Sequence, residues 1–440
     1  MTGLLSWLAV LALPAALAWL GSRFPAALVH PDDSAPHRLV VYGITGALVL
    51  HLLLTGLDAL GLRWHPFLVA ALLALLGIAG RRLARGRPRP AAPAAGEAGW
   101  GDAVALLALL VFALTALTLW TMTPDFVYHW GLKGARFFLH RGVDYAWLAQ
   151  PWNWAIHPDY PNLLPELFAV SALFAGGFEP SPQMLWTVLF FAMMLASARE
   201  ALRGTDGWTR QAALAVVGLT SALFGMGQLM AGAADWMIAA AFLAALPALL
   251  RRPDPAGDWQ VAVAAAFAAA SKIEGAPFAA ILVAAQLVRR IAAERRLDWR
   301  ILLRLGLPSA LVGIPWLFRI FHHGLFLGSN SGPFEIGRAR VILPALAESL
   351  ANPAWHGLSL AVLLGPVLLL VRGVRPAAAV ATLQLLFYLY VYFTAPVETR
   401  YYVLTSFPRL IFHLIPALLV AGVLALGDQG MRDRATNERS

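Results

Sequence analysis

The chain has 440 residues, of which 60% are hydrophobic and 13% charged, and its formal net charge is +9. Soluble domains average about 45–50% apolar and about 25% charged residues, so this composition excludes an ordinary soluble protein and predicts an integral membrane protein. The basic residues are not gathered into one long tail, which argues against a nucleic-acid partner. Because cysteine is absent, disulfides and thiolate metal ligands are excluded as well.

Apolar stretches of spanning length follow one another along the chain. Since a spanning helix needs about 20 apolar residues, we expect an all-α polytopic bundle of about thirteen transmembrane helices. The first stretch lacks the basic start and the cleavage site of a signal peptide, so we count it as a span. The expected spans are 3–20, 39–60, 65–80, 103–121, 184–201, 211–230, 236–250, a pair within 259–290 that is broken at 271–275, 301–318, 358–371, 377–395 and 410–427.

The distribution of basic residues predicts the orientation. Residues 162–176 are apolar but short and contain Pro165 and Glu166, so we interpret them as a juxtamembrane helix and not as a span. This choice places 23 of the 33 Lys and Arg residues on the inner side, as the positive-inside rule requires. The basic stretch 81–99 then becomes a cytoplasmic linker. The long loops 122–183 and 319–357 lie outside, where we expect the function because long loops are usually functional.

The first outer loop carries the most candidate residues. Asp125 follows a span by four residues, at the mouth of the bundle. The stretch 126–138 has an amphipathic pattern with aromatic and basic members, and as a helix it would place His129, Lys133 and Arg136 near one face. Such a helix suits the headgroup plane of a membrane, and an ordinary interfacial anchor is the alternative.

A proline-flanked segment follows in the same loop. His157 and Tyr160 each precede a proline, which restricts both to extended conformations and stiffens the segment. Asp159 is therefore presented rigidly, and it could pair with Asp125 across a pocket. A surface turn without function is the alternative.

Ionisable residues also sit at the expected outer ends of later spans. Asp235 opens one span, Lys272 and Glu274 interrupt another pair, and Arg400 and Arg409 lie between the last two. Ionisable groups near the membrane are costly and are functional candidates by default. Alternatively, Lys272 and Glu274 neutralise each other, and the arginines extend to the interface.

These residue types point to one chemistry. Carboxylates can deprotonate a hydroxyl acceptor or hold a divalent cation, and cations can neutralise a departing phosphate. Together they describe sugar transfer from a lipid phosphate. Patterns for a P-loop, a dinucleotide fingerprint or an HExxH metal site are absent.

The order of these residues resembles the GT-C superfamily of polyprenyl-phosphate-sugar-dependent glycosyltransferases, in particular the bacterial protein O-mannosyltransferase and aminoarabinose transferase-like group. The resemblance covers roughly residues 103–427. It departs from the family in two ways: three spans precede the first core span, and Asp125 is followed by Phe instead of a second acid. The matching features are Asp125, the Tyr-Pro-x-Leu-x-Pro stretch at 160–165, Asp235, the Lys-x-x-Gly break at 272–275, and Arg400 with Arg409.

The resemblance implies a role for each matching position. Asp125 would activate the acceptor, with Asp159 as a second catalytic acid, and a Mg or Mn ion bound by these two is left open. The residues expected to bind the donor phosphate are Lys272, Arg400, Arg409 and Lys133, and the supporting residues are His129, His157, Tyr160, Asp235 and Glu274.

We therefore expect a bacterial inner-membrane glycosyltransferase of the inverting type, with its active site facing the periplasm. Its partners would be a polyprenyl-phosphate-linked sugar, membrane lipid and an unidentified glycan, lipid or protein acceptor. The expected division is an accessory region at 1–100, a catalytic core at 101–427 and a cytoplasmic tail at 428–440. A glycolipid transporter or flippase is the main alternative, and a non-catalytic scaffold is a third.

Overall fold

The computed structural model describes residues 2–24, 28–84, 97–296, 298–325, 332–355, 357–395 and 397–437, with side chains up to residue 427. Every regular element in these ranges is a helix, which confirms the predicted all-α class. Most of the basic linker and the side chains of the tail lie outside the described residues. The longer helices are α1 (Thr2–Gly21), α2 (Ala35–Ala59), α3 (Pro66–Leu83), α4 (Trp100–Thr118), α5 (Gly131–His140), α7 (Leu163–Ala175), α9 (Leu185–Ala201), α10 (Gly207–Gly227), α11 (Asp235–Leu250), α12 (Pro255–Ser271), α13 (Gly275–Glu294), α14 (Trp299–His322), α15 (Ala339–Leu350), α17 (Arg375–Thr394), α18 (Thr399–Phe412) and α19 (Ile415–Asn437).

Short helices complete the outer loops and the C-terminal third. These short helices are η2 (Trp120–Met122), η3 (Phe126–Trp130), α6 (Tyr145–Leu148), η4 (Pro151–Ile156), α8 (Pro180–Gln183), η6 (Ile336–Arg338), η7 (Pro353–Trp355), η8 (Leu358–Leu363) and α16 (Leu364–Leu368).

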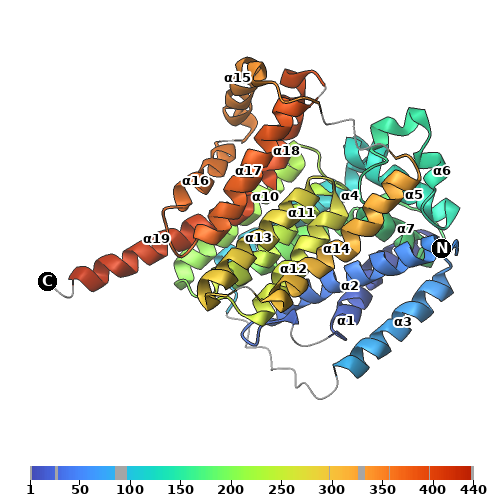
Figure 1. Cartoon of the computed structure of the whole chain (residues 1–440), viewed down its shortest axis with the longest axis horizontal. Helices are drawn as coiled ribbons and strands as arrows, with labels where there is room; N and C mark the ends of the chain where they lie inside the picture. The colour runs from blue at the N-terminus through green and yellow to red at the C-terminus, as the bar shows by residue number, and fades with distance from the viewer. Residues whose placement is uncertain are drawn as a thin grey trace.

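Alanine-rich helices form the middle of the bundle. Helix α12 packs against α11, α13 and α14, and Figure 1 shows these four side by side, with α1 and α2 on one flank and α17 and α18 on the other. Small side chains let the backbones approach closely in a membrane, where packing and not hydrophobic burial drives helix association. All residues of α11 from Asp235 to Leu249 are buried, so this helix is surrounded by protein.

The structure contains eight helices in its described part that are long and apolar enough to cross a membrane. The pair α18 and α19, bent by 49°, would add a ninth. This agrees with a multi-pass membrane protein. The predicted spans at 211–230, 236–250 and 358–371, and the first half of the predicted pair within 259–290, are helical, but their helices are too short or not apolar enough to be counted among these eight. A helix enclosed by other helices, as α11 is, has little contact with lipid and needs neither full length nor uniform hydrophobicity.

Helix α7 differs from the expected juxtamembrane helix. It is helical as predicted, but every residue except Phe174 is buried, so it lies inside the protein and not on its surface. Its Glu166, fully buried, lies 2.6 Å from Nδ1 of His51 on α2. This contact explains how a carboxylate is tolerated there, because buried charges need a partner.

An ionic network joins the helix ends on the arginine-rich side. Arg251 contacts Asp33 and Glu200, both fully buried, and Asp258 pairs with Arg304 at 2.9 Å and Arg290 at 3.3 Å. These arginines hold the ends of α9, α11, α13 and α14 together. The arginines that we expect on the inner side of the membrane therefore also have a structural role in the protein.

Candidate functional site

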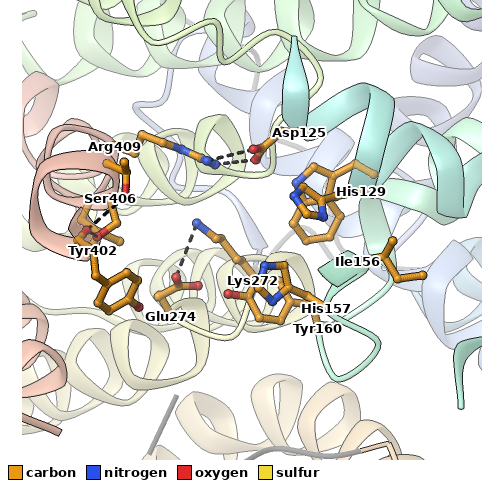
Figure 2. A pocket seen from close by; sticks show the side chains of 13 residues that line it. Asp125, His129, Ile156, His157, Tyr160, Lys272, Glu274, Tyr402, Ser406 and Arg409 are labelled. Atoms are coloured by element: carbon orange, nitrogen blue, oxygen red, sulfur yellow. Dashed lines mark hydrogen bonds and ion pairs between the residues drawn. The ribbon is translucent and has the colours of Figure 1, made fainter. Parts of the chain in front are cut away.

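A polar cavity of about 180 Å³ opens at the end of the bundle opposite this ionic network. Four parts of the chain enclose it: η3 after α4, the segment around η4, the junction of α12 and α13, and α18 (Figure 2). The lining residues are Asp125, His129, Trp130, Ile156, His157, Tyr160, Lys272, Glu274, Tyr402, Thr405, Ser406, Arg409 and Leu410.

Asp125 and Arg409 form a two-pronged ion pair across the cavity roof. Nη1 and Nη2 of Arg409 donate to the two carboxylate oxygens of Asp125 at 2.9 and 2.5 Å, as Figure 2 shows. Such bidentate pairs are among the strongest polar contacts in proteins because two charge-assisted bonds share one fixed geometry. Both oxygens of Asp125 are therefore occupied in holding the guanidinium.

Asp235 bridges both cations of the site. It is fully buried in the first turn of α11, where the helix dipole favours a carboxylate. Its Oδ2 accepts from Arg409 at 2.5 Å, and its Oδ1 lies 3.2 Å from Nζ of Lys272 and 3.0 Å from Nε2 of His413. Nδ1 of the same imidazole lies 2.6 Å from the Tyr388 hydroxyl, so both ring nitrogens are engaged.

The break between α12 and α13 presents Lys272 and Glu274 to the cavity. Helix α12 ends at Ser271, and α13 restarts at Gly275, where an added Cβ would lie 1.8 Å from the Ala268 carbonyl oxygen. Only glycine permits so close an approach of the two backbones. Nζ of Lys272 lies 3.4 Å from Oε1 of Glu274, and Oε2 of that carboxylate is buried with no hydrogen-bond partner among the residues that the structure describes.

Aromatic and imidazole rings form the facing wall. The ring centroids of His129 and His157 are 5.2 Å apart, and His157 stacks on Tyr160 at 4.4 Å. His129 lies on η3, a single π-helical turn, and π-helical turns are frequent at functional sites. Burial lowers the pKa of both imidazoles, that of His157 to about 3, so both are neutral near pH 7.

The candidates brought together by this geometry come from widely separated parts of the chain. The cavity is lined by Asp125, His129, His157, Tyr160, Lys272, Glu274 and Arg409, and Asp235 contacts two of them directly.

Comparisons with known proteins find no match. Neither family models, curated proteins nor solved structures give one, so the site is interpreted from its own geometry.

The structure places two of the expected phosphate-binding residues elsewhere. The side chain of Arg400 is largely exposed and pairs with Glu348 at 2.8 Å, and Arg400 does not line the cavity. Lys133 is fully buried, with Nζ donating to the His157 carbonyl at 2.5 Å. Because Lys133 is buried, it does not form a solvated face with His129 and Arg136. Arg136 is half-exposed and pairs with Asp144.

Asp159, expected as a second catalytic acid, is also outside the cavity lining. Its carboxylate is buried, and burial raises its pKa to about 6. It does not pair with Asp125, whose oxygens bind Arg409. Within the described ranges no group of three or more His, Cys, Asp or Glu side chains is arranged as metal ligands.

Sequence reasoning missed several members of the site. Tyr402, Thr405 and Ser406 line the cavity from α18, and His413 stands behind Asp235 at the bend before α19. A histidine inside the apolar stretch 410–427 is the signal that was available, since ionisable residues in spans are functional candidates. The hydroxyl residues of α18 carry no comparable signal.

Buried Lys133 leads to a prediction about stability. Burial lowers its pKa in the folded protein to about 7, whereas the unfolded chain keeps this lysine protonated up to about pH 10.4. Between these limits the unfolded state binds one proton more, so stability should rise with pH by about 1.4 kcal/mol per unit. We expect Lys133→Met to abolish this rise, as measured by thermal unfolding in detergent at several pH values between the limits. A difference in unfolding temperature between wild type and variant that stays the same at every pH would contradict a neutral Lys133.

Proposed function

We propose that the protein is an integral membrane glycosyltransferase that moves a sugar from a polyprenyl-phosphate donor to a hydroxyl acceptor on the extracytoplasmic side. The observation that carries the proposal is the convergence of Lys272, Arg409 and Asp125 on one cavity, with the buried Asp235 in contact with both cations. A lipid-phosphate substrate enters from the bilayer, which explains why such an enzyme has a membrane-embedded body.

The charges of the cavity fit a departing phosphate. Cleavage of the sugar–phosphate bond leaves negative charge on the phosphate, and prearranged cations stabilise this charge most where water is excluded. Lys272 and Arg409 are held in place by carboxylates before the substrate binds. In this proposal Asp125 orients Arg409, and since the guanidinium outweighs the effect of burial and lowers the carboxyl pKa, Asp125 is a weak proton acceptor.

The distribution of arginine supports the proposed orientation. The ends of α9, α11 and α13 that carry Arg199, Arg251 and Arg289 lie opposite the cavity, and an excess of arginine is typical of the cytoplasmic side. With about thirteen spans, enclosed helices such as α11 counted, we propose that the site faces the periplasm from a bacterial inner membrane. The GT-C-like order of the residues agrees with this arrangement.

A lipid transporter is the second candidate. It is favoured by the 49° bend between α18 and α19, next to the cavity, because broken helices form the binding sites of many transporters. In reconstituted vesicles, a transporter would move the lipid between leaflets with its sugar still attached, whereas a transferase would consume the donor.

The test of the proposed function is sugar transfer in membranes of a deletion strain. Wild-type protein should restore a glycosylated product that mass spectrometry detects, and Lys272→Gln should lower its formation at least about 100-fold, because one cation of the phosphate site is lost. Arg340→Gln, which changes an exposed cation outside the cavity, should act as wild type. Identical glycans with and without the protein would contradict the proposal.

A further inference from the structure

Sugar transfer to a hydroxyl needs a proton acceptor, and the carboxylates of the site are poorly suited to this role. Both oxygens of Asp125 accept from Arg409, and both oxygens of Asp235 are engaged by Arg409, Lys272 and His413. One oxygen of Glu274 has no partner in the described part of the chain, but its other oxygen is 3.4 Å from Nζ of Lys272. It therefore lies beside the cation that would receive the phosphate, on the side of the leaving group.

His129 occupies the opposite wall. Figure 2 shows its ring extending into the cavity from η3, across from Tyr402 and Ser406 of α18, with Lys272 between them. No hydrogen bond or ion pair engages this imidazole within the described part of the chain, and its Nδ1 is buried without a partner. Among the described residues, the one ring that its imidazole contacts is that of His157. A polar ring with no structural partner is available for a substrate.

Burial, together with the nearby cations, keeps His129 neutral and thus able to accept a proton. Burial lowers its pKa, Asp125 on its own segment raises it, and Lys133 from α5, Arg409 from α18 and Lys272 from the α12–α13 junction lower it further. His157, on the neighbouring segment, is also neutral. A base with a pKa somewhat below the working pH is deprotonated and still basic enough for general-base catalysis.

We propose that His129 is the general base that removes the proton from the acceptor hydroxyl. The inference rests on the proposed function and names the acceptor as an alcohol, such as a sugar or a hydroxylated lipid. The acceptor oxygen forms a bond to the anomeric carbon while its proton passes to a ring nitrogen of His129. The bond from that carbon to the phosphate oxygen breaks, and its electron pair remains on the phosphate beside Lys272 and Arg409. The imidazolium then returns its proton to water.

This placement accounts for the two-walled form of the cavity. In a direct displacement the nucleophile and the leaving group occupy opposite faces of the sugar, and in inverting glycosidases the two carboxyl groups stand about 6.5–9.5 Å apart for the same reason. Here the imidazole extends from η3, and Figure 2 shows the Lys272 side chain and the Arg409 guanidinium between it and α18, where the departing phosphate would be held. Inversion at the anomeric carbon is the expected stereochemical outcome.

Chemical rescue tests the role of His129. Purified His129→Ala should bind the polyprenyl-phosphate sugar as wild type does but transfer it at least about 100-fold more slowly. Added imidazole should restore the rate in a saturable manner that requires the neutral form of imidazole. His140→Ala, the same change at a partly exposed histidine of α5 that does not line the cavity, should need no rescue.

Several results would overturn the inference. One is full activity of His129→Ala, and another is a folded, donor-binding variant that imidazole does not rescue. His129→Gln serves as a second variant if the alanine protein does not fold, and its activity should be equally low. A wild-type rate that does not fall at low pH with the loss of one neutral base would also exclude His129. Absence of transfer by the wild-type protein, seen before any variant is compared, would overturn the proposed function together with the inference.

Discussion

Replacing Arg409 by Gln is expected to lower the rate of sugar transfer by about 100- to 1,000-fold, the usual cost of removing one preorganised group that stabilises charge in the transition state. Arg409 contacts both Asp125 and Asp235, which lie 284 and 174 residues before it in the sequence. The rate is measured with purified protein and a labelled lipid-phosphate sugar.

Arg400→Gln is the matched control for this variant. It makes the same substitution on the same helix, at an exposed residue whose partner is Glu348 and which does not line the cavity. We expect its activity to be close to that of wild type. Equal losses in the two variants would show that positive charge on α18 matters in general and not the cavity contact of Arg409.

Asp235→Asn should have the largest effect on stability. The substitution removes the charge that pairs with Lys272, Arg409 and His413 in a fully buried position. Breaking a buried ion pair on one side costs about 3–5 kcal/mol because the remaining charge is left without compensation. Thermal unfolding in detergent should therefore occur at a clearly lower temperature, and bound donor lipid should recover part of the loss by supplying negative charge.

Asp32→Asn provides the comparison at an exposed acid. The side chain of Asp32 is 74% exposed, and surface substitutions of this kind usually change stability by less than about 0.5 kcal/mol. If Asp235→Asn were as stable as this control, the buried charge cluster would not be under the electrostatic constraint that its geometry implies.

The sequence predicted the fold class and the position of most helices, because hydropathy is a local property. It also identified the break at 271–275, where Gly275 and a lysine interrupt an apolar run. Asp235 and Asp125 were recognisable because a carboxylate next to a span is costly unless it has a purpose. The count of spans was harder to predict, since α11 and α7 are enclosed by other helices and do not follow the length rule for helices in lipid.

The assignment of roles within the site required the tertiary structure. Arg400 and Arg409 look equivalent in the sequence, yet one pairs with Glu348 at the surface and the other reaches Asp125. Lys133 resembles a solvated cation of an amphipathic helix, but η3 is a π-helical turn that changes the direction of the helix face, and Lys133 is buried. No sequence pattern records that both oxygens of Asp125 are already bound.

The most direct test of the account uses the absence of cysteine from the natural chain. Thr405 is exposed and lines the cavity, whereas Thr205 lies in the turn after α9 on the arginine-rich side. A membrane-impermeant thiol reagent applied to spheroplasts should label Thr405→Cys, and polyprenyl-phosphate sugar should protect it. Thr205→Cys should be labelled only after the membrane is permeabilised. Labelling of Thr405→Cys only after permeabilisation, or labelling that the donor lipid leaves unchanged, would contradict an extracytoplasmic cavity that binds a lipid-phosphate sugar.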